Sequence, residues 1–261
     1  MLRNLGLAAL VCAVFFVPAP ARAVDVWDLS TEQDDGPGTD NGLYHGVVQN
    51  HDLGGQGGLA DSDYYTLDSA GRSSYEVIID GTTGDENFTS TDIQRLNSSG
   101  TSVLQSSVGL AGYSAAMRWQ NTNASSEVNL IRVQGAACGS ACSTNDVYRI
   151  RFYDSTYSIP RFNNTGTQTT VVLVASMVSF SCSASFHFYN TAGTFLGTAT
   201  NTYSARELFV LPTSSLAFAN GQAGSIIIAH TCGYGGLAGK ATALEPSTGF
   251  AFDTSLIPRI I

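Results

Sequence analysis

The sequence predicts an all-β protein made of two antiparallel β-sandwiches, of jelly-roll or immunoglobulin-like type, after a signal peptide. Short runs of alternating apolar and polar residues recur along the chain, at spacings of roughly 8–12 residues, as in sandwiches. Asn- and Gly-containing turns separate these runs. No window of a dozen residues combines a helical period with capping residues. These three observations favour strands over helices throughout.

The first residues are typical of a secretory signal peptide, Met1–Ala23. Arg3 supplies a positive start, Leu5–Val17 is apolar, and Ala21-Arg22-Ala23 is a small-residue cleavage site. A buried N-terminal strand is the alternative interpretation. No other stretch approaches ~20 apolar residues, so we expect no membrane span in the mature chain. Cleavage after Ala23 would make the protein secreted or periplasmic.

Charge is distributed unevenly along the chain, which has 12 Lys and Arg, 21 Asp and Glu, and a formal net charge of -9. Val24–Tyr157 holds 18 acidic and 6 basic residues, whereas Ser158–Ile261 holds 3 and 4. The shift predicts an acidic N-terminal segment at 24–41, one sandwich at 42–157 and a second at 158–261. The acidic balance excludes a nucleic-acid surface.

Two runs in the first half have clear strand patterns. Ser74–Asp80 places Tyr75, Val77 and Ile79 on one face. Val147–Tyr153 places three apolar side chains inward and two arginines outward (Tyr148, Ile150 and Phe152 against Arg149 and Arg151). The turn at Leu96–Thr101 predicts a hairpin between shorter strands.

The second half repeats these signals. Val171–Val174 is a continuous β-branched run, which predicts a strand buried on both faces. Phe186 and Phe188 share a side opposite His187, and Ser225–His230 is another strand. The turn at Tyr189–Thr194 again predicts a hairpin. The run 159–166 leads into a strand as in an immunoglobulin-like sandwich, which is a fold-level analogy only.

Cysteine usage suits an exported chain. Without Cys12 of the signal peptide, four cysteines remain, an even number that indicates disulfides in an oxidising compartment. Three pairings are open, and we favour Cys138–Cys142 and Cys182–Cys232. A zinc site is the competing interpretation, but no C-x-x-C pair accompanies these residues.

The order of motifs in the first half resembles the bacterial pre-peptidase C-terminal (PPC) domain family. The residues that carry the resemblance are, in order, Asp61–Leu67, Ser74–Gly81, Gly84-Asp85, the hairpin Ile93–Leu104 and the closing Asp146–Ile150. The resemblance implies a jelly-roll-like sandwich of the kind appended to exported enzymes, linked to secretion, to binding of insoluble substrates and sometimes to calcium. The insert with Cys138 and Cys142 departs from the family pattern.

Calcium is the candidate cofactor, and no motif fixes another. Hard cations prefer several oxygen ligands, and Asp61, Asp63 and Asp85 gather near predicted loop edges, with Asp80 and Asp92 nearby. Asp61 and Asp63 are two residues apart, so both carboxylates would point to one side of an extended segment. The alternative is that these residues are solvated loop acids that keep the protein soluble.

Catalytic motifs are absent from the sequence. It contains neither G-x-S-x-G nor H-E-x-x-H, and its four histidines are His45, His51, His187 and His230. We therefore expect no enzyme but a secreted, non-catalytic binding protein. Its partner would be a polysaccharide or an extracellular or surface protein. Aromatic residues of the first half are candidate contacts, about half of them exposed (Tyr64, Tyr65, Tyr113, Trp119, Tyr153, Tyr157).

Two alternatives stay open at this stage. An exported hydrolase of unrecognised type would place a histidine within hydrogen-bonding reach of a serine or aspartate in a concave pocket. A structural component of the cell envelope or an extracellular assembly would expose an unpaired edge strand or a large apolar patch.

Overall fold

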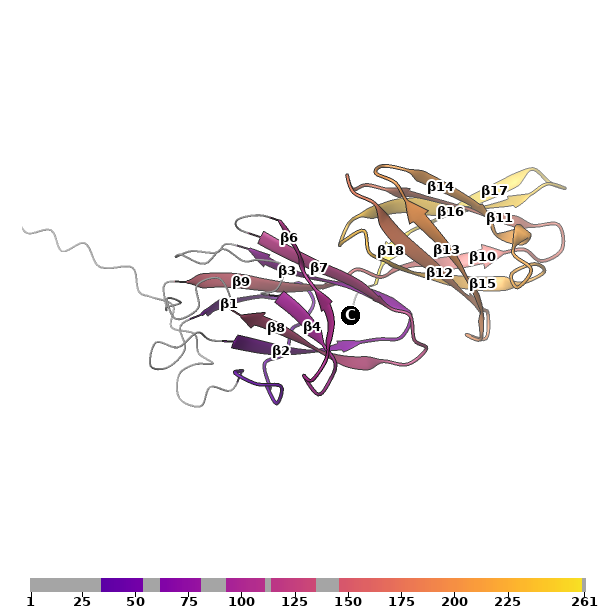
Figure 1. The fold of residues 1–261 in the computed structure, drawn as a ribbon. Helices are drawn as coiled ribbons and strands as arrows, with labels where there is room; N and C mark the ends of the chain where they lie inside the picture. Colours follow the sequence, from indigo (N-terminus) through magenta and orange to yellow (C-terminus); the bar gives the residue numbers. More distant parts are fainter. Residues whose placement is uncertain (1–33, 54–61, 81–92, 111–113, 135–145, 260–261) are drawn as a thin grey trace, which may run out of the picture.

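A computed structural model describes residues 34–53, 62–80, 93–110, 114–134 and 146–259, without the side chains of 108–110. Nearly all regular structure in these residues is antiparallel β-sheet, so the predicted all-β sandwich fold is confirmed. Figure 1 shows two neighbouring sandwiches, the first coloured from indigo through magenta to rose at β9 and the second from salmon-pink at β10 through orange to yellow. No helix in this part of the chain is long and apolar enough to cross a membrane.

The first sandwich consists of two antiparallel sheets. One sheet has the order β1-β9-β3-β7-β6 and the other the order β2-β8-β4-β5. The bounds of these strands are β1 Val48–Asp52, β2 Ser62–Ser69, β3 Ser73–Asp80, β4 Ile93–Leu96, β5 Val103–Ser106, β6 Val108–Leu110, β7 Ser114–Asn121, β8 Glu127–Gln134 and β9 Val147–Asp154.

The core of the first sandwich follows the predicted alternation. Tyr75, Val77 and Ile79 of β3 are buried, as are the inward side chains of β9, among them Tyr148 and Ile150. Side chains of the facing strands β2 and β8 join the same apolar cluster. On the outer face, Arg149 is exposed. Period-two patterning therefore locates this core from the sequence.

The second sandwich has sheets of order β13-β12-β15-β10-β18 and β14-β11-β16-β17. Its described elements are β10 Tyr157–Asn163, β11 Thr169–Ser176, β12 Cys182–Asn190, β13 Phe195–Tyr203, β14 Leu208–Pro212, the 3-10 turn Thr213–Ser215, β15 Ala223–His230, β16 Leu237–Glu245, β17 Phe250–Ser255 and β18 Ile257–Pro258.

Strand β11 corrects one prediction. The run Val171–Val174 is not buried on both faces, because Val172 and Val174 are fully buried while Val171 and Leu173 are only half-buried. The second sheet of the sandwich covers one face of this strand, and the β-branched composition does not reveal that. Phe186 and Phe188 in β12 lie in the core as expected.

Both predicted hairpins are present, as β4–β5 and β12–β13. In each turn a glycine has a positive φ, +71° at Gly100 and +78° at Gly193. The amide N–H of each glycine donates to the carbonyl of the asparagine three residues earlier, Asn97 or Asn190, at 2.9 Å. The turn residues thus act as their sequence indicates.

The predicted disulfide between Cys182 and Cys232 is confirmed. It connects the first residue of β12 to the segment after β15, and these two strands are hydrogen-bonded neighbours. The other predicted pair, Cys138 and Cys142, lies outside the described residues.

Polar contacts fix the two sandwiches to each other. Glu76 of β3 accepts hydrogen bonds from the Arg118 side chain at 2.6 Å and from the backbone N–H of Tyr234 at 2.7 Å, and Tyr234 belongs to the second sandwich. His230 Nε2 lies 2.6 Å from the carbonyl oxygen of Ser155. The junction is therefore a packed interface as well as a short covalent connection.

Candidate functional site

Three buried side chains with metal-ligating groups meet inside the first sandwich: Asp34, His51 and Asp63. One ligand atom from each lies within 4.8 Å of the others. Asp34 precedes the first strand, His51 is in β1 and Asp63 is in β2. The backbone N–H of Tyr64 donates to the Asp34 carbonyl at 2.7 Å, which fixes Asp34 beside β2. We call these three residues the buried cluster.

The imidazole of His51 has a defined orientation. Gln49 Nε2 donates to the Gly42 carbonyl at 2.8 Å, which fixes the amide so that its Oε1 faces His51 Nε2 at 3.0 Å. Because Oε1 can only accept, His51 Nε2 carries a proton and donates. His51 Nδ1 then faces the carboxylate of Asp34, 3.7 Å from Oδ2.

Two tyrosines support the cluster from the core. Tyr148 donates to the Asp63 carboxylate, and the hydroxyl oxygens of Tyr65 and Tyr148 are 2.5 Å apart. Burial raises the pKa of Tyr148 well above its ordinary value, and the negative charge of Asp63 raises it further. Tyr148 is therefore a protonated, neutral donor at neutral pH.

Asn41 connects the buried cluster to the surface. It is fully buried, and its Nδ2 donates to Asp34 Oδ2 at 3.3 Å. Its Oδ1 has no hydrogen-bond partner among the described residues. The backbone carbonyl of Asn41 accepts from the Thr66 N–H at 2.8 Å, so the chain leaves the cluster along the edge of β2.

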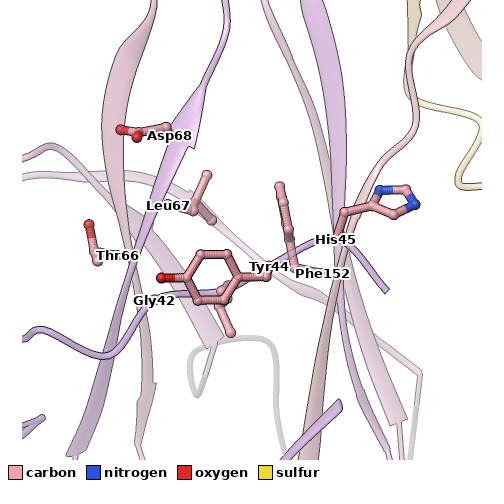
Figure 2. Close-up of a pocket in the computed structure, with 8 residues that line it drawn as sticks. Gly42, Tyr44, His45, Thr66, Leu67, Asp68 and Phe152 are labelled. Carbon is pink, nitrogen blue, oxygen red and sulfur yellow. The ribbon is translucent and has the colours of Figure 1, made fainter. Parts of the chain in front are cut away.

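An open pocket of about 420 Å³ lies beside the segment that follows Asn41. It is lined by Gly42–His45, by Thr66–Asp68 of β2 and by Phe152 of β9. Figure 2 shows the Tyr44 ring extending across the pocket, with the Thr66 hydroxyl and the Asp68 carboxylate on the β2 side. Tyr44 is 69% exposed. We call it the Tyr44 pocket.

Backbone pairing explains why Tyr44 points outward. The backbone N–H of Leu43 donates to the Thr66 carbonyl at 3.0 Å, and the Leu43 side chain is buried in the core. The side chain of the next residue, Tyr44, therefore faces solvent. The Tyr44 ring lies over Gly42, where an added Cβ would be 3.0 Å from the hydroxyl oxygen. Gly42 therefore leaves space for the ring.

His45 links this segment to the second sandwich. Its Nδ1 accepts the Asp154 N–H at 2.9 Å, and its ring packs edge-on against Tyr153 and Tyr234, at 5.8 and 5.5 Å between centroids. Tyr153 and Tyr234 are stacked at 4.6 Å across the junction. Residues 41–46 are thus held by the buried cluster at one end and by this aromatic group at the other.

The predicted calcium ligands do not lie together among the described residues. Asp63 lies in the buried cluster, whereas Asp61 and Asp85 lie outside the described residues. Asp80 is paired with Arg149 and Arg151 in the outer face of its sheet. Opposite charges on neighbouring strands neutralise each other there, so Asp80 has a structural role.

Sequence reasoning missed Asp34 and His51. Asp34 falls in the segment 24–41 that was predicted only to be acidic, and β1 was not identified as a strand. The sequence signal for this part of the site is the pair His51-Asp52, which ends a short run that begins with Val47 and Val48. Two adjacent β-branched residues favour a strand there. Among the predicted aromatic contacts, Tyr65, Trp119 and Tyr157 are buried, Tyr64 and Tyr153 are half-buried, and Tyr113 is outside the described residues.

The remaining histidines have backbone or hydroxyl partners. His187 Nδ1 lies 2.9 Å from Thr198 Oγ1, and His230 Nδ1 accepts the Cys232 N–H at 3.1 Å. Together with the Asp154 N–H on His45, these contacts orient the three rings within the fold.

No family model matches the chain, and no curated protein does. Among solved structures, a calcium-binding mutant of Bacteroides uniformis β-glucuronidase 2 is 11% identical over 75% of this chain and 26% of its own, with a TM-score of 0.20. A putative β-galactosidase from Bacteroides fragilis is 8% identical over 81% and 35%, with a TM-score of 0.21.

A glycosyl hydrolase family 2 member from Bacteroides cellulosilyticus is 9% identical over 88% of this chain and 30% of its own, with a TM-score of 0.22. The chain therefore spans about a quarter to a third of the length of the solved structures named here.

Proposed function

We propose that the protein is an exported, non-catalytic binding protein that recognises carbohydrate through the Tyr44 pocket. The observation that carries the proposal is a largely exposed aromatic ring beside a hydroxyl and a carboxylate in one open pocket. The sequence predicts a binding role, and the open pocket supports the proposal. Its volume suits a small ligand or one or two sugar residues of a longer chain.

The chemistry of the pocket suits a sugar. The apolar C–H face of a pyranose packs on an aromatic ring, and Tyr44 presents such a ring to solvent. The exposed Asp68 carboxylate and the Thr66 hydroxyl accept hydrogen bonds from sugar hydroxyls. The acidic overall charge disfavours phosphate-rich partners such as nucleic acid.

We also propose that the protein is not an enzyme and that it resides in an oxidising compartment. His45 at the pocket uses Nδ1 to accept a backbone N–H, which favours a structural role over general base catalysis. The buried Cys182–Cys232 disulfide suits an exported protein. We also propose, from the sequence pattern, that residues 1–23 are a cleaved signal peptide and that the first sandwich is related to the PPC family.

A glycan array probed with the full mature chain tests this proposal, followed by calorimetric titration of the best ligand. Replacing Tyr44 by alanine should weaken binding by about tenfold, because the stacking surface is lost. Gly42→Ala should also weaken it, since the new methyl group displaces the ring. Phe250→Ala is the matched control, because Phe250 is an exposed aromatic on β17 of the other sandwich.

Three outcomes would overturn the proposal. The first is that no glycan binds the folded protein while a protein partner does. The second is that Tyr44→Ala binds the glycan as tightly as the wild type. The third is hydrolysis of an ester, peptide or glycoside panel by the purified protein, which would favour an enzyme.

A further inference from the structure

We propose that Asp34, His51 and Asp63 bind one divalent transition-metal ion, of the zinc or manganese type, inside the first sandwich. This site differs from the calcium site that the sequence predicts, because one of its donors is an imidazole nitrogen and two of its residues come from outside the predicted acidic set. The proposal about the metal stands apart from the proposed carbohydrate function.

The spacing of the donors fits a common ion. Zinc–ligand distances are about 2.0–2.2 Å, so two ligands of one tetrahedral zinc ion lie about 3.3–3.6 Å apart. The three donor atoms already lie within 4.8 Å of one another, and all three side chains are buried. A contraction of about 1–1.5 Å in the widest separation therefore brings them onto one ion.

Charge also favours a cation here. Asp34 and Asp63 are both fully buried, and a buried carboxylate is costly unless its charge is compensated. Tyr148 and the amide of Asn41 donate hydrogen bonds to these carboxylates. Both of these donors are neutral groups. A divalent ion bound between the two carboxylates would add a positive charge beside them.

The orientation of His51 selects the class of metal. Gln49 accepts the Nε2 proton, which directs the Nδ1 side of the ring toward the carboxylates. Metal-bound histidines usually donate their other N–H to an oxygen in this way. Imidazole is a good ligand for zinc and other transition metals, whereas calcium takes oxygen ligands. The donor set therefore disfavours calcium.

Asn41 supplies a second, independent observation. Its Oδ1 is buried and has no hydrogen-bond partner among the described residues, although its Nδ2 contacts Asp34. A buried amide oxygen without a hydrogen-bond partner, next to Asp34, can serve as a further metal ligand, either directly or through a water molecule.

A bound ion would also act on the surface. Asp34 and Asn41 belong to the segment that continues into Tyr44, and His51 contacts Gln49, which holds the Gly42 carbonyl. Metal binding should therefore order the wall of the Tyr44 pocket. This last link, unlike the metal site itself, rests on the proposed carbohydrate function.

Direct metal binding to the tag-free mature protein tests the site. After dialysis against EDTA, the protein is titrated separately with Zn²⁺, Mn²⁺ and Ca²⁺ by calorimetry, and Co²⁺ is added to record its visible absorption. We expect one Zn²⁺ per chain, a rise in the unfolding temperature, a Co²⁺ spectrum with a nitrogen ligand and much weaker Ca²⁺ binding. No glycan is present, so failure of the carbohydrate proposal cannot affect the result.

Two variants and one control make the assignment specific. His51→Gln should lower Zn²⁺ affinity on the order of a hundredfold and alter the Co²⁺ spectrum. Asp34→Asn should lower the affinity similarly and serves if His51→Gln does not fold by circular dichroism. His187→Gln changes a buried histidine of the second sandwich and should bind Zn²⁺ like the wild type. Absence of Zn²⁺ and Mn²⁺ binding by the wild type, unchanged affinity in both cluster variants, or Ca²⁺ binding as tight as Zn²⁺ would each overturn the proposal.

Discussion

At the scale of single residues, burial sets the protonation of two histidines in the second sandwich. Burial lowers the pKa of His230 to about 4, and its contact with the Ser155 carbonyl opposes this only in part. Burial lowers the pKa of His187 to about 4 as well, with the nearby Arg72 charge adding to the effect. Both imidazoles are therefore neutral in the folded protein at neutral pH.

These shifts predict a loss of stability in mild acid. The folded pKa of each histidine lies below the ordinary value of 6.5, so between pH 6.5 and 4 the unfolded state binds more protons. The free energy of unfolding should therefore fall as the pH drops through this range, by up to about 1.4 kcal/mol per pH unit for each histidine.

Urea denaturation at pH 7, 6 and 5 measures this dependence. His187→Gln removes one titrating group and should lose less stability than the wild type between pH 6.5 and 5. Equal pH slopes for the variant and the wild type would show that His187 does not titrate in this window.

At the scale of elements, the sequence predicts strands better than it predicts the candidate site. Alternation identifies β3 and β9, and the asparagine–glycine turns identify two hairpins, because these signals lie within one short segment. The buried cluster joins Asp34, His51 and Asp63 from three segments through strand pairing, which no local window contains. The same reason explains the wrong prediction for β11. The burial of its outer face depends on whether another layer covers it, and the composition of the strand does not reveal that.

The disulfide is the strongest constraint between two elements of the second sandwich. It connects β12 to the end of β15 across 50 residues of sequence, and both cysteines are buried. The double variant Cys182→Ala/Cys232→Ala should lose about 2–4 kcal/mol of stability, because the cross-link no longer restricts the unfolded chain. Chemical denaturation under non-reducing conditions measures the loss, and an unchanged midpoint would contradict this role.

At the scale of the whole molecule, one arginine ties the end of the chain to the first sandwich. Arg259 follows β18 of the second sandwich, and its guanidinium contacts Asp154, Ser73 and Tyr75 of the first. Its backbone N–H donates to the Thr156 carbonyl at 2.8 Å. Asp154 is fully buried, so this ion pair is shielded from solvent on the carboxylate side.

Replacing Arg259 by glutamine should therefore loosen the junction between the sandwiches. Removing one partner of a buried pair leaves an uncompensated charge and typically costs about 3–5 kcal/mol. We expect a lower unfolding temperature and separation of a single calorimetric transition into two, because the sandwiches have separate apolar cores. Small-angle scattering should show a larger radius of gyration in the variant.

Lys240→Gln is the matched control for this change. It removes the ion pair between Lys240 and Asp253 on the surface of the second sandwich, where both side chains are about half exposed. Solvent screens such a pair, so the cost should stay at about 1 kcal/mol or less, with no change in the number of transitions. If both variants unfold like the wild type, Arg259 does not hold the sandwiches together. If Lys240→Gln is as damaging as Arg259→Gln, loss of a positive charge in general is responsible.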